Sequence, residues 1–306
     1  MEIIQVQGLN NVADIFVARM RGADGFLLEF VDGLADGLPR RQKWIINIST
    51  QFGCPVQCLF CDAGGDFKGN CTADEMIAQI QELAGRHPDL IHDCNKLKVH
   101  FSRMGEPALN DAVLEVIERL PQVLPARNLW CCLATVAPAG RRTWFKGLAE
   151  ILRARFPGRF QLQFSINSTD ESERRRLMPR ALEDLSWVAA QGREYFQPGD
   201  RKLGLNFALV HGAAFEPQEI IRWFDPSIFM LKLTPLNPTS FSAKNNLETV
   251  LRSHRAQSLE NKVESLRRAG FEVILSVGEP LENIIGSNCG QAVQQERGSK
   301  GSARRS

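Results

Sequence analysis

Residues 44–61 have the sequence WIINISTQFGCPVQCLFC, an apolar run that leads directly into a loop with three cysteines. The segment 44–49 has the β-branched composition of a buried strand, and Gly53 and Pro55 mark the turn that follows it. Segments of this kind recur along the chain and alternate with helical patterns. This order predicts an α/β fold with a parallel sheet.

The first strand is followed by five further segments of strand character, with helical patterns between them. These segments are residues 96–102, 129–134, 160–166, 203–210 and 228–234. Six βα units predict a partial (β/α)6 barrel, with an open sheet of the same strands as the alternative. In a barrel, the chemistry lies at the carboxyl ends of the strands.

The repeating pattern covers residues 41–280, and two segments lie outside it. Residues 1–40 form a short N-terminal extension. Residues 281–306 form a C-terminal segment that carries Cys289 and ends in a basic tail, which we expect to be disordered.

The composition is that of a folded, soluble protein. Of the 306 residues, 43% are hydrophobic and 24% are charged, and no long uninterrupted apolar run indicates a membrane span. No secretion signal is visible, so we expect a cytoplasmic protein without a membrane partner. The net charge of +2 gives no strong attraction to polyanions, so nucleic-acid binding would need a local basic patch.

Cys54, Cys58 and Cys61 have the spacing C-x3-C-x2-C. Three thiolates can hold three irons of a [4Fe-4S] cluster, and no fourth cysteine follows at ligand spacing. The remaining iron can then bind S-adenosylmethionine (SAM), and an electron supplied by a flavodoxin-type or ferredoxin-type donor can break the sulfonium bond. The alternatives are a zinc site, which usually has four ligands in paired spacing, and an electron-transfer cluster, which has a fourth cysteine.

A second loop, MGEP at residues 104–107, follows the second predicted strand. Its carboxylate and its free backbone groups suit the ammonium group of SAM. A Gly-Glu-Pro turn is also common between secondary-structure elements, so the loop indicates a SAM site only together with the three cysteines.

With both loops placed, the chain resembles the radical SAM methyltransferase family of the RlmN/Cfr type. This family methylates adenine carbons in ribosomal RNA and, in some members, transfer RNA. The resemblance covers residues 44–293 and rests on segments that occur in the family's order: STQFGCPVQCLFCDAG, FKGNCTADEMIAQI, RMGEPALN, FSINSTDESERRRLMP, LKLTPLNP and SNCGQAV.

The resemblance implies a fold and roles for individual residues. The fold would be the radical SAM partial barrel. Cys289 matches the cysteine that itself receives a methyl group, and Glu29 matches, across a short insertion, the family's proton-accepting glutamate. The residues that would contact SAM are Gly105, Glu106, Ser165, Ile166, Asn167 and Asn237.

The implied mechanism uses two SAM molecules. The first gives its methyl group to the Cys289 thiolate by nucleophilic displacement. The second is cleaved, and the resulting radical takes a hydrogen from the methylthio group. The carbon radical then adds to an sp2 carbon of the substrate.

Two departures from the family pattern bear on this mechanism. Asn47 stands seven residues before Cys54, where the family has a second cysteine that resolves the covalent adduct, and Cys71, Cys131 or Cys132 would have to substitute for it. The N-terminal extension of about 40 residues is also short for the helical accessory domain of RNA-acting members. The short extension and the nearly neutral charge weaken the case for folded RNA. The expected substrate is adenine in RNA, a smaller adenine-containing or heteroaromatic molecule, or a peptide. The other readings are a radical SAM enzyme of another reaction type and a non-enzymatic iron-sulfur protein.

Overall fold

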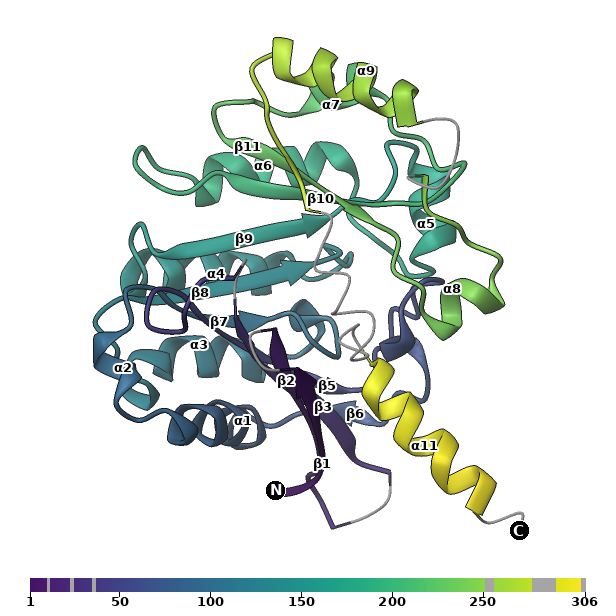
Figure 1. Cartoon of the computed structure of the whole chain (residues 1–306). Coiled ribbons are helices and arrows are strands. Elements are labelled where there is room, and N and C mark those ends of the chain that lie inside the picture. The colour runs from purple at the N-terminus through teal and green to yellow at the C-terminus, as the bar shows by residue number, and fades with distance from the viewer. Residues whose placement is uncertain (10–11, 23–24, 35–36, 251–255, 277–289, 304–306) are drawn as a thin grey trace.

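The computed structural model describes residues 1–9, 12–22, 25–34, 37–250, 256–276 and 290–303 (Figure 1). One ten-stranded sheet organises these residues, in the order β1-β2-β3-β4-β7-β8-β9-β10-β11-β12. Within the described ranges, no helix has the length and apolar character that a bilayer span requires.

The strands from β4 onward in this sheet run parallel to one another, which confirms the predicted α/β class. They are β4 (Trp44–Ile48), β7 (Leu97–Phe101), β8 (Leu129–Thr135), β9 (Phe160–Ser165), β10 (Leu203–Leu209), β11 (Phe229–Pro235) and β12 (Glu272–Leu275). The first six are the strands that the sequence predicted. Strands β1 and β12 stand at opposite ends of the sheet order, and the closer description as a partial barrel remains a prediction.

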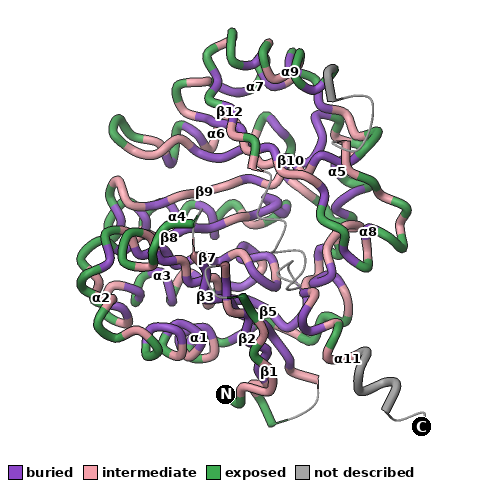
Figure 2. The backbone as a smooth tube through the Cα atoms, viewed as in Figure 1, coloured by how far each residue is buried: buried purple, intermediate pink, exposed green. Residues whose placement is uncertain are grey.

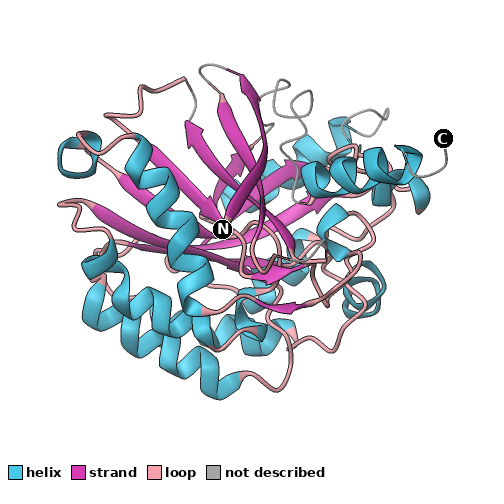
Figure 3. Ribbon diagram, turned by 90° about the horizontal axis from the view of Figure 1, so that it is seen from below, coloured by secondary structure: helices cyan, strands magenta, loops and turns pink. Residues whose placement is uncertain are grey.

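The N-terminal segment continues the main sheet. Strands β1 (Glu2–Leu9), β2 (Ala13–Arg19) and β3 (Leu27–Leu34) form an antiparallel meander, and β3 pairs with β4. Phe16 and Phe30 stack with ring centroids 5.4 Å apart and are buried. The extension is therefore joined to the same core as the parallel strands. Figure 3 shows the strands and the helices that pack beside them.

Helices follow the parallel strands and bury the apolar side chains of the sheet (Figure 2). They are α1 (Ala73–Arg86), α2 (Leu90–Asp93), α3 (Ala112–Val123), α4 (Arg142–Arg155), α5 (Glu171–Leu177), α6 (Leu185–Tyr195), α7 (Pro217–Trp223), α8 (Ser240–Lys244) and α9 (Ala256–Arg268). Helix α1 begins with the predicted capping box, in which the Glu75 amide donates to the Thr72 hydroxyl and the Thr72 amide donates to the Glu75 carboxylate.

Short elements surround the two loops that the sequence singled out. The pair β5 (Gln51–Phe52) and β6 (Gly69–Asn70) encloses the cysteine loop, which ends in the 3-10 helix η1 (Asp62–Gly64). The 3-10 helix η2 (Pro107–Leu109) follows the second loop.

The C-terminal residues form a helix, α11 (Gln291–Ala303), where we expected a disordered tail. Ala292 and Val293 are buried, and the helix contacts β2, β3 and η1. Its first backbone amides donate to the carboxylate of Glu29, which is distant in sequence. Local composition could not reveal this contact, which stabilises the start of the helix.

Candidate iron-sulfur and SAM site

The three predicted cluster ligands lie together in the loop after β4, and each is half-buried. Burial, and then the charge of Cys61, raise the pKa of Cys54 to about 12. Burial raises the pKa of Cys58 well above its ordinary value, and Cys61 and Cys54 raise it further. The three sulfur atoms are therefore close enough for their negative charges to repel one another. A bound cationic centre relieves such repulsion and stabilises the thiolates.

The cysteine loop is compact and needs glycine at two positions. Gly53 has a φ of 79°, and a Cβ there would lie 2.8 Å from the carbonyl oxygen of Gly65. A Cβ on Gly64 would lie 2.9 Å from the Cα of Gln57. The loop is also attached to α5, because the Leu59 amide donates to the carbonyl of Leu177. These contacts fix the backbone that carries the three thiols.

The donor set of the loop is three thiols from Cys54, Cys58 and Cys61. Across the described ranges, no group of three or more His, Cys, Asp or Glu side chains is arranged to hold one metal ion. In a [4Fe-4S] cluster each thiolate binds a different iron, and three thiols can hold three of its irons.

Glu106 lies near Cys54 and Cys58. It follows β7, and the cysteine loop follows the adjacent strand β4. The charge of Glu106 raises the pKa of both Cys54 and Cys58. The buried carboxylate accepts hydrogen bonds from the Thr135 hydroxyl at 2.5 Å, the Val136 amide at 2.9 Å and the Ala108 amide at 3.1 Å. Although these bonds lower the pKa of Glu106, burial is the larger effect and raises it to about 7.

Gly105 allows the second loop to approach the first. Its φ is 105°, and a Cβ there would lie 2.7 Å from both the Cβ of Gln51 and the hydroxyl of Thr50. The Glu106 amide donates to the side-chain carbonyl of Gln51 at 2.8 Å, and the Thr50 amide donates to the carbonyl of Met104 at 2.8 Å. The two loops therefore form one hydrogen-bonded unit at the carboxyl ends of β4 and β7.

Sequence reasoning did not identify Gln51 or Thr135 as part of this site. Each lies just after a strand or at its carboxyl end, and each is buried and bonded to Glu106 or its amide. Both could have been identified from the sequence as polar side chains near the carboxyl end of a predicted parallel strand, where site residues are expected. The Thr135 hydroxyl donates to Glu106, the predicted SAM-binding glutamate.

The raised pKa of Glu106 predicts a pH-dependent contribution to stability. Because its folded pKa of about 7 exceeds the ordinary value of 4.5, the contribution is complete below about pH 4.5 and is lost as the pH rises through about 7. Relative to Glu106→Gln, which does not titrate, the wild type should lose about 3 kcal/mol between these limits. Urea unfolding of iron-free protein between about pH 5 and pH 8 measures this, with the exposed Glu260→Gln as control. Parallel pH profiles for wild type and Glu106→Gln would contradict the assignment.

The other predicted SAM contacts lie at the carboxyl ends of neighbouring strands. Ser165 ends β9, Ile166 is buried in the core, and Asn167 adopts a left-handed φ of 63°. The Asn167 side-chain carbonyl accepts from the Ala208 amide at 2.9 Å. Asn167 also lines a hollow of about 360 Å³ beside the end of β10. Because its side chain is buried, Ile166 has mainly backbone groups to offer a ligand.

Asn237 is exposed in the segment between β11 and α8, and this segment packs on the cysteine loop. The Thr239 hydroxyl donates to the carbonyl of Phe60 at 2.9 Å, and the Asn245 side-chain amide donates to the carbonyl of Leu59 at 2.8 Å. The carboxylate of Asp62 accepts from two backbone amides at the start of α8. Asn237 thus belongs to a segment that contacts the residues between and after the cluster cysteines.

Cys289 itself lies outside the described residues, but the next residue is described. Gly290 packs so closely on the backbone of Asp62 and Ala63 that a Cβ on it would overlap them. The Gln294 side-chain amide donates to the carbonyl of Asp62 at 3.2 Å. The residue after Cys289 is therefore in contact with the residues that directly follow Cys61.

Glu29 lies in the middle of β3 and is fully buried. Its carboxylate forms an ion pair with Arg103 at 2.7 Å and accepts from the backbone amides of Gly290 and Val293. These contacts connect Glu29 to the C-terminal segment. Its role as a proton acceptor, which the resemblance implied, stays a prediction.

Asn47 is the residue that replaces the family's second cysteine. Its side-chain carbonyl accepts from the Ser102 hydroxyl at 3.2 Å, and in the parallel register Asn47 pairs with His100, which pairs in turn with Cys132. The other two proposed substitutes, Cys71 and Cys131, are buried in the main hydrophobic core.

Comparisons with known proteins agree with this site. No family model matches the sequence. A "Probable dual-specificity RNA methyltransferase RlmN" of Deinococcus deserti is 25% identical over 296 residues, which cover 92% of this chain and 81% of the relative. A protein of the same description from Desulfitobacterium hafniense is 28% identical over 287 residues, which cover 90% of this chain and 74% of the relative.

The fold is also found in a solved structure. A radical SAM methyltransferase from Sphaerobacter thermophilus superposes with a TM-score of 0.72 at 21% identity, covering 94% of this chain and 80% of that one. This likeness shows the fold, and the matches to the two curated relatives cover 92% and 90% of this chain. The chain is an enzyme, and its sequence and fold are similar to those of radical SAM methyltransferases of the RlmN/Cfr type.

Proposed function

We propose that this enzyme cleaves SAM with a [4Fe-4S] cluster held by Cys54, Cys58 and Cys61, and that it methylates an sp2 carbon through Cys289. The observation that carries this proposal is the contact between Gly290 and the backbone of Asp62 and Ala63. Gly290 follows Cys289, the proposed methyl carrier, and Asp62 and Ala63 follow Cys61, a proposed cluster ligand. When bound, the cluster supplies the electron that breaks the sulfonium bond of SAM.

Glu106 organises the proposed SAM site. An ionised carboxylate has about four acceptor positions, and three protein donors already use part of this capacity. The remaining capacity and its negative charge suit the ammonium of SAM, and a bound cation favours the ionised form of Glu106. Gly105, Ser165, Ile166, Asn167 and Asn237 supply the further proposed contacts at the same edge of the sheet.

The proposed role of Cys289 is nucleophilic. Its thiolate forms a bond to the methyl carbon of one SAM molecule as the bond from that carbon to the sulfonium breaks, and S-adenosylhomocysteine leaves. Gly290, the residue after Cys289, contacts the backbone of Asp62 and Ala63. A second SAM molecule bound with the cluster would supply the radical that activates the methyl group. We expect the partial-barrel curvature of the sheet to enclose this step.

The proposed substrate is an adenine carbon in RNA, because the curated relatives carry the name of an RNA methyltransferase. A flavodoxin-type or ferredoxin-type protein would supply the electrons. A second candidate is a radical SAM reaction of another type on a smaller molecule or a peptide. Asn47 favours it, because an amide bonded to Ser102 has no thiol with which to resolve the family's covalent adduct.

Incubation with methyl-labelled SAM tests both candidates. Anaerobically reconstituted enzyme, a reductant and cell extract should release 5′-deoxyadenosine and place label in the RNA fraction. Release of 5′-deoxyadenosine with label only in methionine, the other product of SAM cleavage, and in Cys289 would support the second candidate. No release of 5′-deoxyadenosine would contradict both.

A further inference from the structure

We infer that Glu29 is a positioning residue, which holds the segment that begins at Cys289 against the cysteine loop by binding the first turn of α11. The inference rests on the proposed function, since it assumes that the position of Cys289 matters for catalysis. Its geometric basis is independent of that function, because every contact below joins described residues.

The carboxylate of Glu29 binds the start of α11 through both of its oxygens. One oxygen accepts from the Gly290 amide at 2.6 Å, and the other accepts from the Val293 amide at 3.1 Å. The first amides of a helix have no partners within the helix, and they favour a negative charge. A carboxylate from β3 therefore caps a helix that begins more than 250 residues later in the chain.

Arg103 connects the same carboxylate to the proposed SAM loop. It forms a 2.7 Å ion pair with Glu29, and both side chains are almost completely buried. The Arg103 amide donates to the carbonyl of Ile48 at 3.1 Å, which fixes Arg103 at the end of β4. In the sequence, Arg103 is followed directly by Met104 and then by Gly105. The ion pair thus joins the C-terminal segment to the loop that contacts the cysteines.

Ser49 provides a second connection between these elements. Its hydroxyl donates to the carbonyl of Glu29 at 2.5 Å and accepts from the Met104 amide at 3.1 Å. Glu29 is therefore bound to β4 and to the Met104 loop through its backbone, and to α11 through its side chain. The contacts through Ser49 use the Glu29 backbone, so a substitution of the Glu29 side chain should leave the Met104 loop in place.

The contacts favour positioning over proton acceptance. A buried carboxylate is stable only while it keeps its partners, and those of Glu29 are an arginine and two backbone amides. Releasing the segment would leave a buried charge with fewer hydrogen bonds. This cost keeps Gly290, the residue that follows Cys289, against Ala63.

Glu29→Gln tests the inference in the full-length, cluster-loaded enzyme. The amide keeps the side-chain volume but loses the charge and one acceptor oxygen. Hydrogen exchange of the peptide that contains Gly290 and Val293 should accelerate about tenfold or more, as expected for a lost charge-assisted hydrogen bond. Methylation of Cys289 should fall by a similar factor. Cleavage of SAM and the change that SAM produces in the cluster's electron paramagnetic resonance spectrum should stay as in the wild type.

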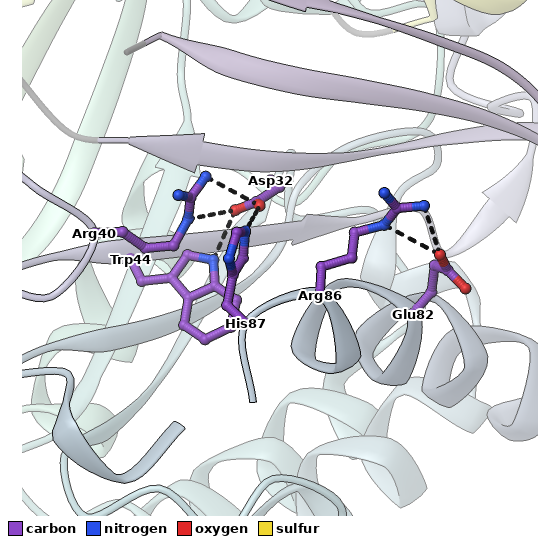
Figure 4. Close-up of polar contacts among 6 residues, drawn as sticks. All are labelled: Asp32, Arg40, Trp44, Glu82, Arg86 and His87. Carbon is purple, nitrogen blue, oxygen red and sulfur yellow. Dashed lines mark hydrogen bonds and ion pairs between the residues drawn. The ribbon is translucent and has the colours of Figure 1, made fainter. Parts of the chain in front are cut away.

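The matched control is Asp32→Asn. Asp32 is a second buried carboxylate on β3, and it binds Arg40, Trp44 and His87, none of which belongs to α11 (Figure 4). Like Glu29→Gln, this variant removes a buried carboxylate charge that is paired with an arginine, here Arg40. It should leave both the exchange of α11 and the methylation of Cys289 unchanged.

Three outcomes would overturn the inference. The first is that hydrogen exchange and Cys289 methylation are unchanged in Glu29→Gln. The second is that Asp32→Asn changes both as much as Glu29→Gln does. The third is that Glu29→Gln loses substrate methylation while its hydrogen exchange and its Cys289 methylation stay normal, which would make Glu29 a proton acceptor. If Glu29→Gln does not fold, Val293→Pro is the second variant. It removes the backbone amide that donates to the Glu29 carboxylate, and it does so in the first turn of α11, where proline is tolerated. An unmethylated Cys289 in the wild type would refute the proposed function, while the exchange comparison would still decide whether Glu29 anchors the segment.

Discussion

Replacing Cys58 by alanine is expected to abolish the iron-sulfur cluster and to reduce SAM cleavage by about a thousandfold or more, to background. Cys58 is the middle ligand of the loop, and its pKa is raised by both neighbouring cysteines, so its sulfur lies close to theirs. The remaining two thiols cannot hold three irons. Iron and sulfide content, the visible absorption of the reconstituted protein and release of 5′-deoxyadenosine measure the effect.

The control for this prediction is Cys94→Ala. Cys94 is also buried, but it lies just after α2, and its thiol donates to the carbonyl of Arg40. Its removal tests the general cost of losing a buried cysteine, and the cluster should remain. A Cys58→Ala protein that keeps a cluster that responds to SAM would refute the ligand assignment.

Replacing Cys289 by alanine is expected to separate methyl transfer from SAM cleavage. The substitution removes the only thiol proposed to carry the methyl group, so methylation of the substrate should fall to background. The cysteine loop and the Glu106 site are contributed by other parts of the chain, so 5′-deoxyadenosine should still be released. Mass spectrometry of wild-type protein should show a gain of one methylene on Cys289, and the variant should lack it.

Cys132→Ala is the comparison for Cys289→Ala, because Cys132 pairs with His100, which pairs with Asn47. Cys132→Ala leaves Cys289 in place, so Cys289 should still gain its methylene. Substrate methylation at the wild-type rate in Cys289→Ala would show that the carbon is delivered by another route. It would favour the second reaction type over transfer through a methylated cysteine.

The sequence by itself determined the α/β class and the six strands, and it predicts the chemistry of the cysteine loop. These features are encoded locally. Strand segments such as 44–49 are apolar over a short window, and the spacing of Cys54, Cys58 and Cys61 is set within one loop. The capping box at Thr72 is also a pattern of four residues, and the structure confirms it.

The partners of Glu106 and Glu29 were decided only by the tertiary structure. Thr135 reaches Glu106 because parallel strands β7 and β8 lie side by side, a contact that joins residues 29 positions apart. Glu29 and Gly290 are 261 positions apart, and their hydrogen bond makes a helix of a tail whose composition predicted disorder. A buried carboxylate must find donors wherever the fold supplies them, and its own sequence neighbours do not specify which donors those are.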